Sequence, residues 1–265
     1  MKRIKTTFER SRQKNRIALM PYLPIGYPSV ETTLALAPAL VEAGADLFEL
    51  GVPYSDPQAD GATIQHATHV ALQNGVTPRV CLEVAAKIRQ SVDVPLLFMT
   101  YYNPIARMGD TEFCKAASEA GVDGLIVPDL PPEEADGLRV ATKQHELDTA
   151  FLVAPTSTDE RLRIVTEASS GFVYCVSLSG ITGARAQLAS GLADYLARVR
   201  RFTDLPLAVG FGISRPEHVR EVARHADGAI VASALIDRLD KLAPAEQVAG
   251  AAAYVRELAA ATAKS

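Results

Sequence analysis

Apolar segments recur along the 265-residue chain, and the stretches between them have a helical pattern. Most of these segments are continuously apolar rather than alternating, which is typical of parallel strands covered on both faces. We therefore predict eight buried parallel strands. They cover residues 17–25, 45–53, 94–102, 124–130, 149–155, 171–178, 205–212 and 228–235.

Several of the intervening segments carry signals for a helix start. Ser157-x-x-Glu160 and Ser214-x-x-Glu217 have the spacing of a capping box, and each follows a strand directly. A short helix is expected before the first strand. Strand and helix alternate eight times, so the pattern predicts an α/β protein of the (β/α)₈ or TIM-barrel class with a short N-terminal helix.

Glycines and turns bear on the choice of fold. Gly44 and Gly121 end helical segments, where a left-handed residue is favoured before the next strand. The alternative fold is a doubly wound open sheet, but the first strand-to-helix turn, "IGYPSVE", lacks the GxGxxG phosphate fingerprint. No linker or low-complexity stretch interrupts the chain, so we expect one barrel domain over residues 1–265.

Composition and charge exclude several classes of protein. A hydrophobic content of 48% with 22% charged residues is that of an ordinary globular protein. A net charge of −4 indicates neither nucleic acid nor an anionic membrane as partner. Cys81, Cys114 and Cys175 form no CxxC pair, which suits a reducing compartment. The basic N-terminus lacks the apolar core of a signal peptide, and no apolar run spans a bilayer, so we expect a cytoplasmic protein.

In this fold the chemistry lies at the carboxyl ends of the strands and in the loops after them. None of the eight lysines falls within a predicted strand, which argues against a Schiff-base mechanism. His66 and His69 have the spacing of a surface pair on one helix face, and no third metal ligand accompanies them. We expect no metal and no cofactor, which leaves the carboxylates as candidate catalysts.

Glu49 lies within the second predicted strand, in phase with Leu47 and Gly51. If that phase faces the barrel interior, burial should raise the pKa of Glu49 toward neutrality, where a general acid–base works best. The alternative is a structural glutamate paired with an arginine or backbone amides. Asp60 follows in a loop rich in Gly and Pro, and by itself it would be interpreted as the N-cap of the next helix.

The loops after strands six, seven and eight have different chemistry. They contain "SLSGITGAR" (177–185), "GFGISRPE" (210–217) and "VASAL" (231–235), and each offers Gly or Ser backbone amides. Loops after strands seven and eight commonly bind phosphate in this fold. Each loop alone is weak evidence because turns need glycine, but three such loops together indicate a phosphate site.

At this point the sequence resembles the tryptophan synthase α subunits. The resemblance covers about residues 7–260 and rests on these motifs, in order: "FELGVPYSDPQADGATIQ", "MTYYNPI", "GVDGLIVPDLPPEE", "LVAPTST", "FVYCVSLSGITGAR" and "AVGFGIS". It implies a barrel lyase that cleaves indole-3-glycerol phosphate to indole and D-glyceraldehyde 3-phosphate. It also implies a β-subunit partner, in a heterotetramer of two α and two β subunits.

The resemblance assigns roles to particular residues. It implies that Glu49 and Asp60 are the catalytic carboxylates. The implied indole pocket consists of Tyr22, Met99, Ile126, Pro128, Tyr174 and Phe211. The implied phosphate-binding residues are Thr182, Gly183, Gly212, Ser214 and Ser233. The partner interface would lie around Tyr54, Asp56, Pro57 and Gln58, where we expect Tyr54 to be an exposed aromatic with no burial partner.

The resemblance also fits the chemistry that the residues allow. Carbon–carbon cleavage without a Schiff-base lysine or zinc needs an electron sink in the substrate, and an indole ring supplies one. Glu49 can protonate C3 of the ring and take up the proton of the side-chain hydroxyl. Asp60 can accept a hydrogen bond from the ring N–H and favour the positive charge that develops there.

Three positions depart from the commoner family pattern. Gln58 and Ala62 replace Leu and Pro, and Ala232 stands where Gly is usual, next to the expected phosphate. One rival function is another phosphate-binding barrel, such as an indole-glycerol-phosphate synthase or a sugar-phosphate isomerase; the synthase would need strand-end lysines. The other rival is a non-catalytic barrel that activates its partner, against which the intact Glu49 and Asp60 argue.

Overall fold

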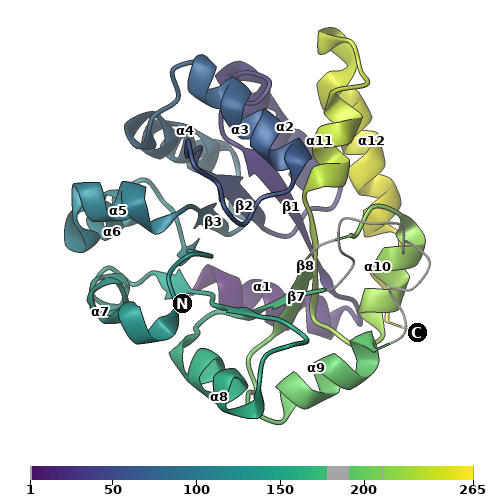
Figure 1. Cartoon of the computed structure of the whole chain (residues 1–265). Helices are drawn as coiled ribbons and strands as arrows, with labels where there is room; N and C mark the ends of the chain where they lie inside the picture. The colour runs from purple at the N-terminus through teal and green to yellow at the C-terminus, as the bar shows by residue number, and fades with distance from the viewer. Residues whose placement is uncertain (1, 178–190, 211, 265) are drawn as a thin grey trace.

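The computed structural model describes residues 2–177, 191–210 and 212–264. Within them, nine strands form one parallel sheet in the order β5-β4-β3-β2-β1-β9-β8-β7-β6. This order, with sequential neighbours throughout, excludes a doubly wound sheet, and the sheet curls into a barrel (Figure 1). The strands are β1 Ala18–Pro24, β2 Phe48–Gly51, β3 Leu96–Met99, β4 Gly124–Ile126, β5 Asp148–Thr149, β6 Leu152–Val153, β7 Val173–Val176, β8 Leu207–Gly210 and β9 Gly228–Val231.

The predicted fifth strand is two short strands in the structure. β5 pairs with β4, and β6 pairs with β7. Between them the N–H of Ala150 donates to Leu125 of β4, and the carbonyl of Phe151 accepts from Tyr174 of β7. One extended segment thus passes from one neighbour to the other and closes the barrel, as the stagger of tilted strands requires. The prediction of a single continuous strand over 149–155 was wrong in this respect.

The observed strands are also shorter than the apolar runs that predicted them. Thr100, Tyr101 and Val127 are buried although they lie beyond the ends of β3 and β4. Their burial reflects packing at the mouth of the barrel rather than strand pairing. Hydrophobic pattern therefore overestimates strand length at the end where the loops turn inward.

Helices surround the barrel (Figure 1). They are α1 Arg3–Gln13, α2 Val30–Glu42, α3 Ala62–Gln73, α4 Pro78–Ser91, α5 Tyr102–Met108, α6 Asp110–Glu119, α7 Asp136–Gln144, α8 Asp159–Ala168, α9 Leu192–Arg200, α10 Pro216–Ala223, α11 Ser233–Leu239 and α12 Gln247–Ala259, with short 3₁₀ turns at Pro132–Glu134 and Pro244–Glu246. No helix in the described ranges combines the length and the apolar character needed to cross a membrane.

The observed helix ends can be compared with the start and stop signals predicted from the sequence. Gly44 and Gly121 have φ of 111° and 82°, so both take the positive φ that was predicted. The capping boxes were wrong. The N-cap of α8 is Thr158, because Ser157 turns back to accept the N–H of Ala154, and α10 begins after Arg215 without a side-chain cap.

Alternation along the strands divides the core into two layers. Phe48 and Leu50 pack outward against the helices in a large apolar layer. Leu47, Leu97 and Ile126 belong to a smaller cluster that fills the barrel interior. Every second residue of a strand therefore points inward, which fixes the direction of each functional side chain.

Helix α1 closes the N-terminal end of the barrel. It crosses behind the strands in Figure 1, and its Ile4 and Phe8 are buried in the interior cluster. The ring of Phe8 lies 5.8 Å from that of Phe172, centroid to centroid. The predicted short N-terminal helix is therefore a plug that extends the barrel core.

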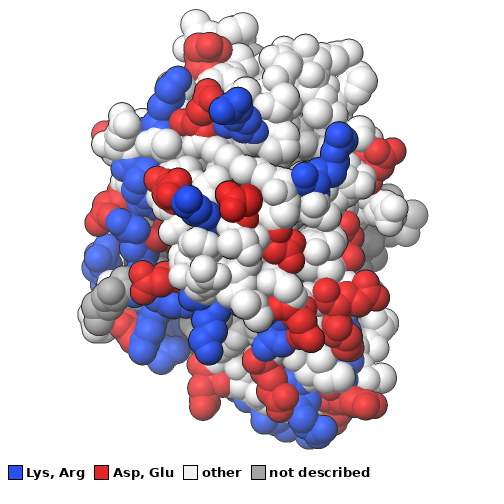
Figure 2. Space-filling view, turned by 90° about the vertical axis from the view of Figure 1, so that its left-hand side faces the viewer, with Lys and Arg blue, Asp and Glu red and all other residues white. Residues whose placement is uncertain are grey.

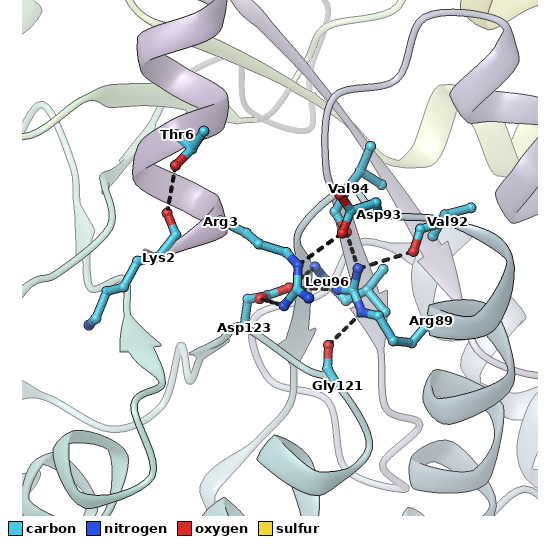
Figure 3. Close-up of polar contacts among 10 residues, drawn as sticks. All are labelled: Lys2, Arg3, Thr6, Arg89, Val92, Asp93, Val94, Leu96, Gly121 and Asp123. Atoms are coloured by element: carbon cyan, nitrogen blue, oxygen red, sulfur yellow. Dashed lines mark hydrogen bonds and ion pairs between the residues drawn. The ribbon is translucent and has the colours of Figure 1, made fainter.

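The same end of the barrel is held by a repeated contact between an arginine, an aspartate and a strand. Asp123 accepts hydrogen bonds from Arg89 at 2.7 Å and from the N–H of Leu96, at the start of β3, at 2.9 Å (Figure 3). Arg3 of the plug adds a third bond to the same carboxylate.

The contact occurs twice more with the same arrangement. The backbone N–H groups of Leu19 and Leu207 donate to aspartates that also pair with an arginine; these sets are Arg16, Asp46 and Leu19, and Arg200, Asp227 and Leu207. Burial raises the pKa of Asp227, but the Leu207 N–H and Arg200 outweigh it and hold that pKa below its usual value. We call these three sets the arginine–aspartate clamps.

The packing of α1 inside the barrel predicts that its buried residues contribute to the free energy of unfolding. Replacing Phe8 with alanine removes an aromatic ring from the barrel interior and should lower the free energy of unfolding by about 3 kcal/mol. Urea unfolding followed by circular dichroism measures this loss. Lys5→Ala, on an exposed position of the same helix, is the control and should change stability by less than about 0.5 kcal/mol. Equal effects of the two substitutions would contradict the role of α1 as part of the core.

Candidate active site

Glu49 is a buried carboxyl in the apolar interior of the barrel. It lies on β2 in phase with Leu47, as predicted, and only 1% of it is exposed. Its Oε1 is buried without a hydrogen-bond partner among the described residues. Burial raises the pKa of Glu49 to about 8. The alternative of a glutamate paired with an arginine finds no support in the described contacts.

Two tyrosines flank Glu49 inside the barrel mouth. Tyr22 of β1 pairs in register with Glu49, and Tyr174 lies on β7. Burial, with smaller contributions from nearby carboxylates, raises the pKa of both phenols well above the usual value, so they stay neutral. A Cβ at Gly51 or Gly210 would collide with the Tyr22 or Tyr174 hydroxyl, so the two glycines make room for these rings.

Asp60 faces the same cavity from the loop after β2. The predicted N-cap role was wrong, because Gly61 is the N-cap of α3 and no side chain caps that helix. Burial raises the pKa of Asp60, and a hydrogen bond with Tyr101 opposes that rise by favouring the ionised form. The Tyr101 hydroxyl also accepts the N–H of Ala59 at 2.9 Å. Tyr101 thus holds the segment that carries Asp60.

The cavity itself is lined by groups from opposite sides of the barrel. Its lining residues are Tyr22, Glu49, Asp60, Ile64, Met99, Tyr174, Gly212, Ile213, Ile230, Ala232 and Ser233. The sequence-predicted residues Tyr22, Met99, Tyr174, Gly212 and Ser233 are therefore brought together with the two carboxylates. The cavity therefore combines two carboxyls, two tyrosine rings and the Gly and Ser of the loops after β8 and β9.

Other predicted site residues lie elsewhere. Ile126 is buried in the interior cluster below the cavity, packed with Met99, rather than on its lining. Pro128 and Ser214 are half-buried and also do not line it. The remaining predicted residues, Thr182, Gly183 and Phe211, lie outside the described residues.

The loop between the two carboxylates is held mainly from within. The side chain of Gln65 donates to the carbonyls of Pro57 and Asp60, and Ser55 donates to the Asp56 carboxylate. Tyr54 is half-buried, with its ring centroid 5.3 Å from that of Tyr101, so the expectation of an exposed aromatic without a partner was wrong. Asp56 and Gln58 are exposed.

Two of the departures from the family pattern lie near the site, and one of them, Ala232, lines the cavity. Ala62 is the first residue of α3, a position where proline would preset the helical φ, and this helix also lacks a side-chain cap. Ala232 lines the cavity beside Ser233, so its methyl group occupies space that a glycine would leave open.

Sequence reasoning missed several lining residues. Ile230 shares the inward phase of β9 with Gly228, so alternation along that strand could have found it. Tyr101 follows β3 in the run "TYY", but nothing local shows that its hydroxyl reaches Ala59, 42 residues earlier. Within the described ranges, no group of three or more His, Cys, Asp or Glu residues is placed to hold a metal ion.

Known proteins resemble this chain over nearly its whole length. The sequence matches the tryptophan synthase alpha chain family over residues 8–263. It is 57% identical over 263 residues to the tryptophan synthase alpha chain of Chloroflexus aggregans, covering 99% of this chain and 98% of that one. It is 56% identical over 265 residues to the alpha chain of Chloroflexus aurantiacus, covering both chains fully.

Solved structures of tryptophan synthase alpha chains have the same fold as this chain. The fold superposes on a chain of Mycobacterium tuberculosis tryptophan synthase with a TM-score of 0.90 and 43% identity, covering 98% of both chains. It superposes on the tryptophan synthase alpha subunit of Legionella pneumophila with a TM-score of 0.92 and 35% identity, covering 99% of this chain and 98% of that one.

The raised pKa of Glu49 predicts a particular pH dependence of stability. Its folded value of about 8 exceeds the roughly 4.3 of an unfolded glutamate, so its stabilising contribution is complete below pH 4 and is lost as pH rises toward 8. Wild-type stability relative to Glu49→Gln should therefore fall between pH 5 and pH 8, by up to about 1.4 kcal/mol per pH unit.

Urea unfolding of both proteins across this range measures the difference. Glu83→Gln, which removes an exposed carboxyl from α4, is the control. A stability difference that does not change with pH, or that changes equally in the control, would show that Glu49 is not a desolvated acid.

Proposed function

The chain belongs to the tryptophan synthase alpha chain family, and from that premise we propose how its own residues perform the family reaction. The reaction is the cleavage of indole-3-glycerol phosphate to indole and D-glyceraldehyde 3-phosphate, a lyase step of tryptophan biosynthesis. The observation that carries the assignment of residues is the unpaired, buried carboxyl of Glu49 in a cavity shared with Asp60.

Glu49 is the general acid and then the general base. With a pKa of about 8 it is mostly protonated at neutral pH and can give its proton to C3 of the indole ring. The resulting carboxylate takes the proton of the side-chain hydroxyl. As the carbonyl of the aldehyde forms, the carbon–carbon bond breaks and its electron pair returns to the ring. Glu49 ends the cycle protonated, so no external acid or base is consumed.

Asp60 stabilises the positive charge that develops during this sequence. Its carboxylate accepts a hydrogen bond from the ring N–H, and the charge that it supplies lies where the protonated ring is most electron-poor. The hydrogen bond with Tyr101 favours the ionised form of Asp60 and fixes its position. The two carboxyls therefore have different tasks in one cavity, Glu49 as proton donor and acceptor and Asp60 as the hydrogen-bond acceptor for the ring N–H.

The apolar and polar sides of the cavity bind the two ends of the substrate. Tyr22, Met99 and Tyr174 pack against the indole ring, and Ile126 supports Met99 from the interior cluster below. Phe211 is proposed as a further wall of that pocket, whereas Pro128 lies off the cavity lining and takes no part in it. Backbone amides at Gly183, Gly212 and Ser233 bind the phosphate, and Thr182 and Ser214 belong to the same phosphate-binding loops. The described part of this arrangement supports the proposal because Glu49, Gly212 and Ser233 line one cavity.

We further propose that a tryptophan synthase β subunit docks on the loop of Tyr54, Asp56, Pro57 and Gln58, in a complex of two α and two β subunits. The tryptophan synthase structures that this fold matches support the partner. A cytoplasmic location is proposed with it, in line with three cysteines that are buried and unpaired.

Surface charge is consistent with a protein partner rather than a polyanion. Figure 2 shows both signs of charge on the side formed by α5, α6 and α7, with Asp and Glu gathered at the lower right. Positive charge on this face is interrupted by acids, unlike the continuous basic patch of a nucleic-acid-binding surface.

The test of the catalytic assignment is Glu49→Gln, assayed for indole release with the isolated subunit. Because an amide cannot shuttle protons, kcat should fall by about 10²–10⁴-fold while the fold, followed by circular dichroism, is retained. Glu83→Gln is the control and should keep the wild-type rate. More than a tenth of the wild-type rate in Glu49→Gln would overturn the assignment. A wild-type subunit without any lyase activity, alone or with a β subunit, would favour the non-catalytic activator instead.

The interface proposal predicts a separation of binding from chemistry. Asp56→Lys reverses an exposed charge in the middle of the loop and should weaken β-subunit binding by at least tenfold, with an almost unchanged lyase rate of the isolated subunit. Calorimetry with the purified β subunit measures binding, and Glu83→Lys on α4 is the charge-matched control. Unchanged binding, or a collapse of the isolated rate, would contradict the interface.

A further inference from the structure

His218 is a buried histidine that the mechanism above does not use. It lies in the first turn of α10, and only 8% of it is exposed. Its ring faces the loop of Gly212 to Arg215, which connects the cavity to the helix. Gly212 and Ile213 of that loop line the cavity.

The imidazole contacts the loop at several points. The N–H of Ser214 donates to Nδ1 at 3.3 Å, and the Ser214 hydroxyl lies 3.5 Å from the same atom. Nη2 of Arg215 lies 3.1 Å from Nε2. A backbone hydrogen bond with Gly212 adds a contact on the cavity side. One ring therefore bridges the residues on both sides of Ile213.

The ring is kept in its neutral form. Burial and then the neighbouring Arg215 lower the pKa of His218, and these effects outweigh the Gly212 hydrogen bond and the charge of Glu217, which raise it. An imidazolium would present N–H groups to the Ser214 N–H and to a guanidinium, neither of which accepts a hydrogen bond. Neutral His218 accepts at one ring nitrogen and keeps an N–H on the other, so it can accept the Ser214 N–H at Nδ1.

A second buried side chain fixes the same loop from another helix. The hydroxyl of Tyr254 on α12 donates to the carbonyl of Ser214 at 3.0 Å. The guanidinium of Arg238 on α11 lies 5.9 Å from the centroid of the Tyr254 ring. Ser214 is therefore held at its N–H by His218 and at its carbonyl by Tyr254.

Gly212 has φ of 77°, a left-handed conformation that glycine accepts readily and that turns the chain sharply between β8 and α10. Such a turn positions backbone amides only if its two ends are fixed. We propose that His218, assisted by Tyr254, is a positioning residue for substrate phosphate: it holds Ser214 at the end of the loop, so that the amides of Gly212 and Ile213, which line the cavity, face the phosphate. This inference rests on the phosphate site of the proposed function.

The proposal predicts a defect confined to the phosphate end of the substrate. In His218→Ala the loop loses its support, so KM for indole-3-glycerol phosphate should rise about tenfold, with kcat within about threefold of wild type. The inhibition constant of glyceraldehyde 3-phosphate should rise by a similar factor. That of indole, which has no phosphate, should stay the same.

Two further variants separate positioning from a general loss of structure. In His218→Asn, Oδ1 can accept the Ser214 N–H at the place of Nδ1, so this variant should recover most of the wild-type KM. Tyr254→Phe removes only the hydroxyl and should raise KM by a few-fold in the same direction. His225→Ala, an exposed histidine after the same helix, is the control and should change none of these constants.

Each outcome bears on the proposal. An unchanged glyceraldehyde 3-phosphate constant in His218→Ala, or an equal rise of the indole constant, would overturn the role of His218 while leaving the lyase assignment intact. A wild-type enzyme that glyceraldehyde 3-phosphate does not inhibit would overturn the proposed phosphate site and this inference together. Failure of the Glu49→Gln test alone would remove the catalytic assignment but not the binding role.

Discussion

The arrangement of the active site depends on one unfavourable interaction, the burial of the Glu49 carboxyl among apolar groups, with no counter-charge from the part of the chain that the structure describes. Desolvation raises its pKa to about 8, so the side chain is an acid at neutral pH without help from a metal or a second charge. The residues around Glu49 keep water and charge away from it and so keep its pKa high. The neutral phenols of Tyr22 and Tyr174 fill the space beside it, and Gly51 leaves room for one of them. An arginine within reach would pair with the carboxylate, lower its pKa and remove the proton that the reaction needs.

Across the residues that the structure describes, the carboxyl groups at the two ends of the barrel have opposite surroundings: those at one end are paired with arginines, and those at the other end are not. At the N-terminal end, the three arginine–aspartate clamps give each half-buried carboxylate a guanidinium and a backbone N–H, so its desolvation is compensated. At the other end, Glu49 is left unpaired, and Asp60 has Tyr101 as its partner rather than a cation. Stability is concentrated where the strands begin, and reactivity where they end. This division lets the loops at the active end vary, as at Ala62 and Ala232, without loss of the barrel.

The sequence could predict the barrel, the inward phase of Glu49 and the glycine turns at Gly44 and Gly121, because each depends on a local pattern. It could not predict contacts between residues distant in the chain. Asp123 follows Gly121 in the run "AGVD", yet its arginine partner lies 34 residues away, and Tyr101 reaches Ala59 across 42. The capping boxes failed for a related reason, since Ser157 bonds to the preceding turn and Ser214 is held by His218 and Tyr254. Hydrogen bonds made in the folded structure, rather than local spacing, therefore determine which residue caps each helix.

The plug formed by α1 has a consequence for the path of protons. Ile4, Phe8 and Phe172 fill the barrel below Glu49, so water cannot form a chain to the carboxyl from that side. Among the described residues, the cavity that holds Glu49 is lined by the groups of the barrel mouth, which the substrate itself occupies, so protons reach the carboxyl from that side. While the substrate is bound, the carboxyl exchanges its proton with the ring and the hydroxyl of one molecule rather than with bulk water. The helix that stabilises the barrel from below thereby favours a turnover in which Glu49 gives one proton to the ring and takes another from the hydroxyl of the same molecule.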